Sequence, residues 1–273
     1  MLKCALVGCF LFLLHTLYAQ PNFPQRAVHI QELAISGLSN VPTSELADIE
    51  GEIKQRCCAY AETKEMKERI VYAFQERGYF EARIKSLDAT PVATSEAPPA
   101  VKVAVDVSNG QRFRLKKIQF HGNEALSTDE LRQQFRIEDG NLFKVEKIRQ
   151  GMEDLRRLYA SRGYINFAPV PNTEADDQSA MITLTIDVDE GKQFFLGGLL
   201  LDGEEPHAGD GAKLLAAWKP MEGKVYDGNK IEEWWQLAST MLPPGATLEK
   251  LLQLRQDQAT GIVTALLNLP ATN

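Results

Sequence analysis

The feature that most constrains the fold of this 273-residue chain is an internal repeat with an almost constant offset. The segment Arg77–Phe80 recurs as Arg162–Ile165, 85 residues later, and Val105–Gly110 recurs as Ile186–Gly191, 81 residues later. Repeated matches at nearly one spacing indicate a structural module that occurs more than once along the chain. We therefore expect tandem modules rather than one large domain.

The second copy predicts the plan of the module: strand, two helices, two strands. Ser127 and Glu130 form a capping box, which predicts a helix start. The second helix has one apolar face, made of residues spaced by four, three and four positions: Ile148, Met152, Leu155 and Tyr159. Gly163 is predicted to end this helix. The segment Ile182–Val188 alternates apolar and polar residues, which is typical of a half-buried strand.

The first copy follows the same plan, with helices expected over 44–54 and 66–74 and a third strand over 101–107. Its second strand is predicted from Tyr79 to Leu87. The segment Pro91–Ala100, rich in Pro, Ala, Ser and Thr, is predicted to be a long flexible hairpin loop. Its counterpart in the second copy is Pro171–Ser179, which is polar and acidic and is also predicted as a loop.

A third copy is predicted from architecture more than from residue identity. Gly223–Tyr226 resembles Gly140–Phe143, 83 residues earlier. The expected elements are one strand, two helices and a closing hairpin, over Phe194–Leu201, Ala212–Trp218, Ile231–Met241, Leu248–Leu254 and Ile262–Leu269.

The N-terminus is predicted to be a signal peptide covering residues 1–19. Lys3 precedes an apolar run, Cys4–Leu14, and Ala19 is a suitable cleavage residue. The run is too short for a transmembrane helix of about 20 residues. Cleavage would leave two cysteines, Cys57 and Cys58, whose adjacency rules out an ordinary long-loop disulfide. A vicinal disulfide, a bond to another chain and a pair of thiols at a helix end are all open alternatives.

Composition and motifs argue against several classes of function. The net charge of −7 disfavours a nucleic-acid-binding protein, which needs a basic surface. His29, His121 and His207 are scattered and no Cys-x-x-Cys occurs, so no metal site is expected. The sequence has neither a Gly-x-Ser-x-Gly nucleophile elbow nor a phosphate-binding loop. We therefore expect no enzymatic activity, no cofactor and no small-molecule substrate.

Three segments of the second copy resemble the POTRA (polypeptide-transport-associated) family: Lys117–Ser127, Leu155–Ile165 and Val188–Phe194. These domains stand on the periplasmic side of BamA-type outer-membrane assembly proteins. The resemblance implies an α+β fold of tandem modules, each a three-stranded mixed sheet packed by two antiparallel helices. The expected modules span 27–112, 113–193 and 194–271, with the third divergent.

The resemblance also implies a binding function, in which extended segments of outer-membrane proteins, or partner subunits, add to an edge strand. An edge strand offers unpaired N–H and C=O groups that an added strand can satisfy. The second strand of each module is the expected edge, here Tyr79–Lys85 and Tyr164–Val170. The alternating positions that would contact the ligand are Tyr79, Glu81, Arg83, Lys85, Tyr164, Asn166, Ala168 and Val170. The alternative is that these strands are simply edges, protected by Lys85, Pro169 and Pro171.

The sequence ends at Asn273, so we expect no membrane β-barrel after the third module. The expected roles are a periplasmic chaperone, or an accessory subunit that binds a separate barrel protein, with peripheral association at the outer membrane. An envelope or cell-division scaffold, held by an uncleaved N-terminal anchor, is the alternative function.

Overall fold

The computed structural model describes residues 29–55, 63–92, 100–205 and 207–269. The predicted signal segment, Cys57 and Cys58 lie outside the described residues. Among the helices that are described, none combines the length and the apolar character that crossing a membrane requires.

The first module contains two helices and a three-stranded mixed sheet. Its elements are β1 (His29–Ser36), α1 (Thr43–Gln55), α2 (Thr63–Gln75), β2 (Arg83–Val92) and β3 (Ala100–Ser108). The strand order is β1-β3-β2, with β1 parallel and β2 antiparallel to the central strand. The buried side of the sheet packs on the helices through residues such as Val103, Val105, Ile49 and Phe74.

The second module repeats this topology with the strand order β4-β6-β5. Its elements are β4 (Arg114–His121), α3 (Thr128–Arg132), α4 (Val145–Ser161), β5 (Ala168–Asp176) and β6 (Met181–Asp189). The predicted capping box is confirmed, because the Ser127 side chain accepts from the Glu130 amide and the Glu130 carboxylate accepts from the Ser127 amide. The predicted apolar face of α4 is buried in the core.

The third module has the same strand order, β7-β9-β8, which confirms the faintest copy of the repeat. Its elements are β7 (Phe195–Asp202), α5 (Asp210–Trp218), a 3₁₀ turn (Lys219–Met221), α6 (Gly228–Ala238), a second 3₁₀ turn (Ser239–Met241), α7 (Leu248–Leu251), β8 (Leu252–Asp257) and β9 (Ile262–Asn268). Three tryptophans, Trp218, Trp234 and Trp235, fill its core.

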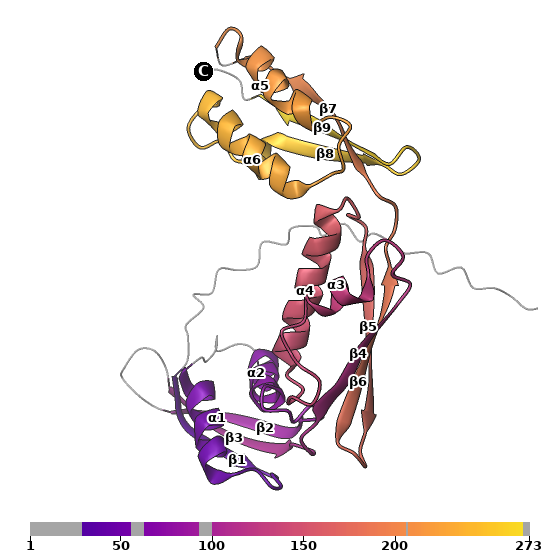
Figure 1. Ribbon diagram of the computed structural model, residues 1–273. Coiled ribbons are helices and arrows are strands. Elements are labelled where there is room, and N and C mark those ends of the chain that lie inside the picture. The colour runs from indigo at the N-terminus through magenta and orange to yellow at the C-terminus, as the bar shows by residue number, and fades with distance from the viewer. Residues whose placement is uncertain (1–28, 56–62, 93–99, 206, 270–273) are drawn as a thin grey trace, which may run out of the picture.

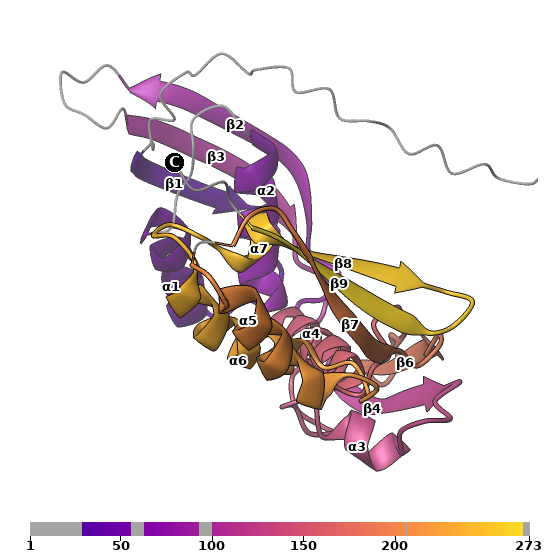
Figure 2. The same cartoon turned by 90° about the horizontal axis from the view of Figure 1, so that it is seen from above.

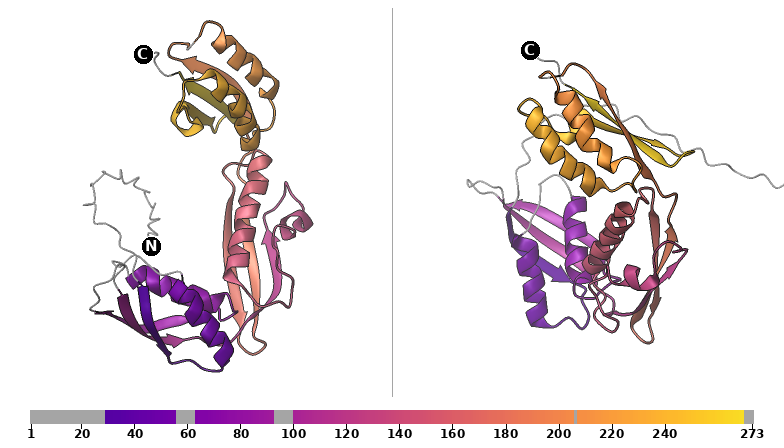
Figure 3. Two further views of the ribbon diagram at one scale, coloured as in Figure 1. Left: turned by 90° about the vertical axis from the view of Figure 1, so that its left-hand side faces the viewer. Right: turned by 45° about the horizontal axis from the view of Figure 1, so that its top comes forward.

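The chain is thus an α+β protein of three units, each with its own sheet and its own hydrophobic core. Figure 1 shows the units following one another, from the indigo first module to the yellow end of the third. Figure 2, seen from above, and the two views of Figure 3 show that the helices of each unit lie on one face of its sheet.

The connections between neighbouring units share one backbone arrangement. The Phe113 amide donates to the Gly78 carbonyl at 2.8 Å, and the Phe194 amide donates to the Gly163 carbonyl at 2.9 Å. Both glycines have a positive φ, 87° and 85°, which a residue with a side chain adopts only with strain. The repeated Arg-Gly-Tyr segment therefore does two things: it ends a helix and receives the next module.

Several predicted boundaries are wrong. The predicted loop Pro171–Ser179 is too long, because β5 continues to Asp176 along β6 and only residues 177–180 form the turn. In the first module β2 continues through Pro91 and Val92, and β3 begins at Ala100; residues 93–99 lie outside the described part. The segment Leu248–Leu251 is a helical turn rather than the start of a strand. An edge strand needs only one good neighbour, so polar sequence and prolines do not prevent it.

Candidate binding site at the open sheet edges

Each three-stranded sheet has two edges, and in the second and third modules one of them is partly covered. The Leu115 amide donates to the Asn141 carbonyl at 2.9 Å, and the Gly140 amide donates to the Leu115 carbonyl at 2.7 Å. These bonds occupy the outer side of β4 where the strand begins. The segment from Gly223 covers β7 in the same way, by bonding to Leu196. The edges formed by β5 and β8 are therefore the open ones.

The direction of backbone groups in β5 follows from contacts of the central strand β6. The Ala180 carbonyl accepts from the Arg114 amide at 2.9 Å, and a Cβ on Gly122 would lie 2.4 Å from the Val188 carbonyl oxygen. Even-numbered residues of β6 therefore point their backbone groups at β4, and odd-numbered ones point at β5. Combined with the pairing register, this directs the backbone groups of four β5 residues to the open edge: Pro169, Pro171, Thr173 and Ala175.

The same reasoning applies to the other two sheets. In β2 the outward residues after its bulge are Leu87, Ala89 and Pro91. In β8 they are Leu252, Leu254 and Gln256. Proline has no N–H, so β2 lacks one outward donor and β5 lacks two. The edge of β8 contains no proline; its Leu252 amide donates to the Leu248 carbonyl, and the Leu254 and Gln256 amides face outward.

The uncovered face beside β8 also differs from those of the other sheets. Phe195 and Ile262 are each 40% exposed and lie opposite each other on β7 and β9, and Leu200 is 57% exposed on the same sheet. In the first sheet the corresponding face carries an ion pair between Lys102 and Glu32. The third sheet therefore combines a proline-free edge, with outward amides at Leu254 and Gln256, and an apolar outer face.

The structure places the eight predicted contact residues at different sites. Tyr79 and Tyr164 lie before the strands, in a turn closed by bonds from Ala82 to Tyr79 and from Phe167 to Tyr164. Tyr79 is only 2% exposed and belongs to the first core, and Tyr164 packs edge-to-face on the ring of Tyr159. The predicted strand starts at Tyr79 and Tyr164 are therefore wrong: β2 begins at Arg83 and β5 at Ala168.

The remaining six residues are solvent-facing but not in the predicted phase. Glu81 and Asn166 are exposed and precede the strands. Arg83 and Lys85 are exposed in β2, where Lys85 lies 3.8 Å from the Asp106 carboxylate. Ala168 and Val170 have exposed side chains in β5, but the phase derived above turns their backbone groups toward β6. The predicted residues thus lie in β2 and β5 or just before them, and their contact with a ligand stays a prediction.

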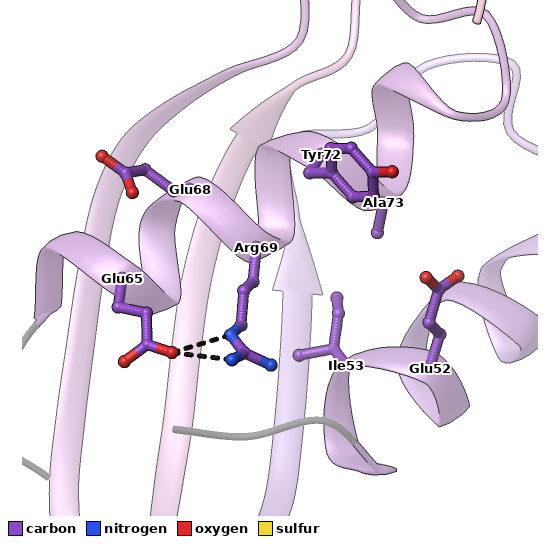
Figure 4. A pocket seen from close by; sticks show the side chains of 7 residues that line it. All are labelled: Glu52, Ile53, Glu65, Glu68, Arg69, Tyr72 and Ala73. Atoms are coloured by element: carbon purple, nitrogen blue, oxygen red, sulfur yellow. Dashed lines mark hydrogen bonds and ion pairs between the residues drawn. The ribbon is translucent and has the colours of Figure 1, made fainter. Parts of the chain in front are cut away.

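A groove of about 410 Å³ lies between α1 and α2 in the first module (Figure 4). Ile53 and Ala73 point toward each other across it, and Glu68 points away. Arg69 donates to Glu65 at 2.7 and 3.0 Å, and Arg77 pairs with Glu52 at 3.1 Å. The first pair lies within α2, and the second joins α1 to the turn that follows α2.

Tyr72, at the end of this groove, has its pKa raised to about 12, first by burial and then by the nearby carboxylates of Glu76 and Glu146. Because a phenol with so high a pKa stays protonated, this hydroxyl acts as a hydrogen-bond donor at neutral pH.

Comparison with known proteins agrees with the topology. Residues 113–191 match the model of the POTRA family, described as a surface antigen variable number repeat. BamA, the outer membrane protein assembly factor of Neisseria meningitidis serogroup B, is 26% identical over 158 residues, which are 54% of this chain and 19% of that protein. The chain therefore spans about a fifth of that relative.

The fold is also found in a solved structure of POTRA domains 3–5 of Haemophilus influenzae BamA. It superposes with a TM-score of 0.61 at 16% identity, covering 91% of this chain and 99% of that one. At this level of identity the similarity concerns the fold. Together with the matched family model, it shows that the second module is a POTRA domain and that the chain as a whole is similar in fold to the POTRA part of BamA.

Proposed function

We propose that this chain is a periplasmic binding module that assists the assembly or transport of outer-membrane proteins in a Gram-negative-type bacterium. Its support is the POTRA match together with the similarity to BamA. The proposed ligand is an extended segment of an outer-membrane protein or of a partner assembly protein. The activity is binding, and it requires no catalytic group or cofactor.

The proposal rests on one observation: in each module the second strand, which is β2, β5 or β8, lies at an open edge of the sheet. A strand added there satisfies N–H and C=O groups that otherwise bond to water. Backbone bonding depends little on the ligand sequence, which suits a module that receives many different clients.

Among the three edges, β8 is the strongest candidate under this proposal. Leu254 and Gln256 offer outward amides on an edge without proline, whereas Pro91 interrupts the edge of β2 and Pro169 and Pro171 interrupt that of β5. The exposed apolar face next to it would also accept alternate apolar side chains of an added strand.

The test removes one outward donor and leaves the ladder of the sheet intact. Gln256→Pro deletes the amide at the open edge, and the prolines of β5 in the same phase indicate that this backbone accommodates the ring. Gln256→Ala keeps the amide and is the matched control. Proline at Ala168 would be a poor test, because that amide faces β6.

Binding is measured by fluorescence anisotropy with a labelled peptide copied from an outer-membrane strand. We expect Gln256→Pro to lose about tenfold in affinity, equivalent to ~1.4 kcal/mol or roughly one hydrogen bond. Gln256→Ala should bind as the parent does. Fluorescence of the three tryptophans, all in the third module, verifies that the variant is folded. Unchanged binding by a folded Gln256→Pro protein would eliminate the β8 edge as the contact.

A further inference from the structure

A basic cavity of about 440 Å³ lies in the second module, where β4 and α4 begin. Its polar lining consists of Arg114, Arg136, Asn141, Lys144 and Lys147, and its apolar lining consists of Ile137 and Leu142. Four of these residues are cationic and none is acidic. Since the whole chain has a net charge of −7, this is a local concentration of the opposite charge.

These cations are not neutralised by the protein itself. Across the residues that the structure describes, none of the four forms an ion pair. Arg114 donates one bond, to the Gly140 carbonyl at 2.7 Å, which leaves other guanidinium donors available. The nearby Glu146 carboxylate is engaged by Arg149 at 2.6 and 2.8 Å. The adjoining cavity contains one carboxylate, that of Glu138.

The start of α4 carries two lysines where the helix dipole disfavours positive charge, and its capping carboxylate comes from elsewhere: Glu76 of the first module accepts from the Glu146 amide at 2.8 Å. Lys144 is the N-cap residue and makes no side-chain capping bond, and Lys147 lies in the first turn. Positive charge is unfavourable there because the N-terminus of a helix carries partial positive charge. The equivalent residue of the third module is Asp227, whose carboxylate accepts from the Asn229 amide at 3.0 Å and caps α6. Such departures from local stability are expected at functional sites.

We propose that this cavity binds a phosphate group, as a site separate from the sheet edges. Two guanidinium groups can each present a fork of N–H donors to phosphate oxygens, and two lysines add point charges. The Asn141 amide supplies a neutral donor. A phosphate monoester carries about −1.5 to −2 charges, so several cations around one cavity match it better than they match a single carboxylate.

The site is tested with the full chain, labelled with ¹⁵N and titrated with inorganic phosphate at constant ionic strength. We expect saturable shifts of the Asn141, Lys144 and Lys147 amides. Shifts that do not saturate, or a hexaglutamate peptide that binds as tightly as phosphate, would overturn the proposal. Vesicles of phosphatidylglycerol, compared with phosphatidylcholine, distinguish the source: selective co-sedimentation identifies a lipid headgroup, and its absence alongside saturable phosphate binding identifies a free phosphate compound.

Lys144→Asp separates a loss of binding from a loss of folding. The α4 amide equivalent to the one that Asp227 caps in the third module is already bonded to Glu76, so the helix should keep about its present stability while phosphate affinity falls about tenfold or more. Lys224→Asp, an exposed position of the third module, makes the same change in net charge and should leave affinity within about twofold. Equal weakening by both variants would show that only overall charge matters and would refute the site.

Discussion

Replacing Gly163 with Ala should destabilise the second module and its connection to the third more than the same replacement at Gly140. The residue has φ 85°, a conformation that costs a residue with a side chain about 1–2 kcal/mol. A Cβ here would also lie 2.7 Å from the Phe194 carbonyl oxygen and 2.8 Å from Val225 Cγ1. Relieving such overlap costs about 1–3 kcal/mol. The sum is about 2–5 kcal/mol.

The matched control is Gly140→Ala, because Gly140 has φ 88° and no atom within 4 Å of a built Cβ. It should cost only the backbone part, about 1–2 kcal/mol. Urea unfolding is followed by circular dichroism, with hydrogen exchange of the Phe194 amide reporting the bond to the Gly163 carbonyl. Gly163→Ala should expose this amide to exchange and Gly140→Ala should not. Equal destabilisation by the two variants would refute the role assigned to the junction.

Two further predictions concern hydrogen-bonded carboxylates of the second module. Tyr159→Phe removes the bond from its hydroxyl to Glu190 at 2.8 Å and should lower the free energy of unfolding by about 1.5–3 kcal/mol in urea titrations, whereas Tyr164→Phe should change it little. Arg149 is the main reason that the pKa of Glu146 falls to about 2, so the stability from this carboxylate should be complete above about pH 4.3 and be lost as pH falls toward 2. Glu146→Gln should remove this dependence of the free energy of unfolding on pH. The effect should stay below about 1 kcal/mol because the pair is exposed. An unchanged dependence between about pH 2 and about pH 4.3 in the variant would contradict the role given to Glu146.

The sequence predicts the repeated topology because the signals that set it are local. The capping box at Ser127 and Glu130 acts over three residues, and the apolar face of α4 follows from helical spacing. Glycines such as Gly163 recur because the backbone there needs a positive φ. Even the faint third copy was predictable as a fold, since its alternation of strands and helices survives without the Arg-Gly-Tyr segment.

The edges and the basic cavity are harder to predict because they depend on partners far away in sequence. The polar segment from Pro171 to Asp176 is a strand only because β6 lies beside it. Which backbone groups of β5 face outward depends on β4, on the other side of β6. The cavity collects Arg114, Arg136 and Lys144, which are separated along the chain. The one local signal for it is the lysine at an N-cap position, where Ser, Thr, Asp or Asn is usual.

Comparing the three modules with one another helps to locate candidate functional sites. The modules share one topology, so the fold allows each of them to have any stabilising feature that another one has. Proline protects the outward edges of β2 and β5, yet β8 has no proline, with the charge of Arg255 as its protection. Asp227 caps α6 from within its own module, whereas α4 has Lys144 at the N-cap position and receives its capping carboxylate from Glu76 of the first module. Each difference leaves a surface that a ligand of defined chemistry can use: an added strand at β8 and a phosphate group beside Lys144.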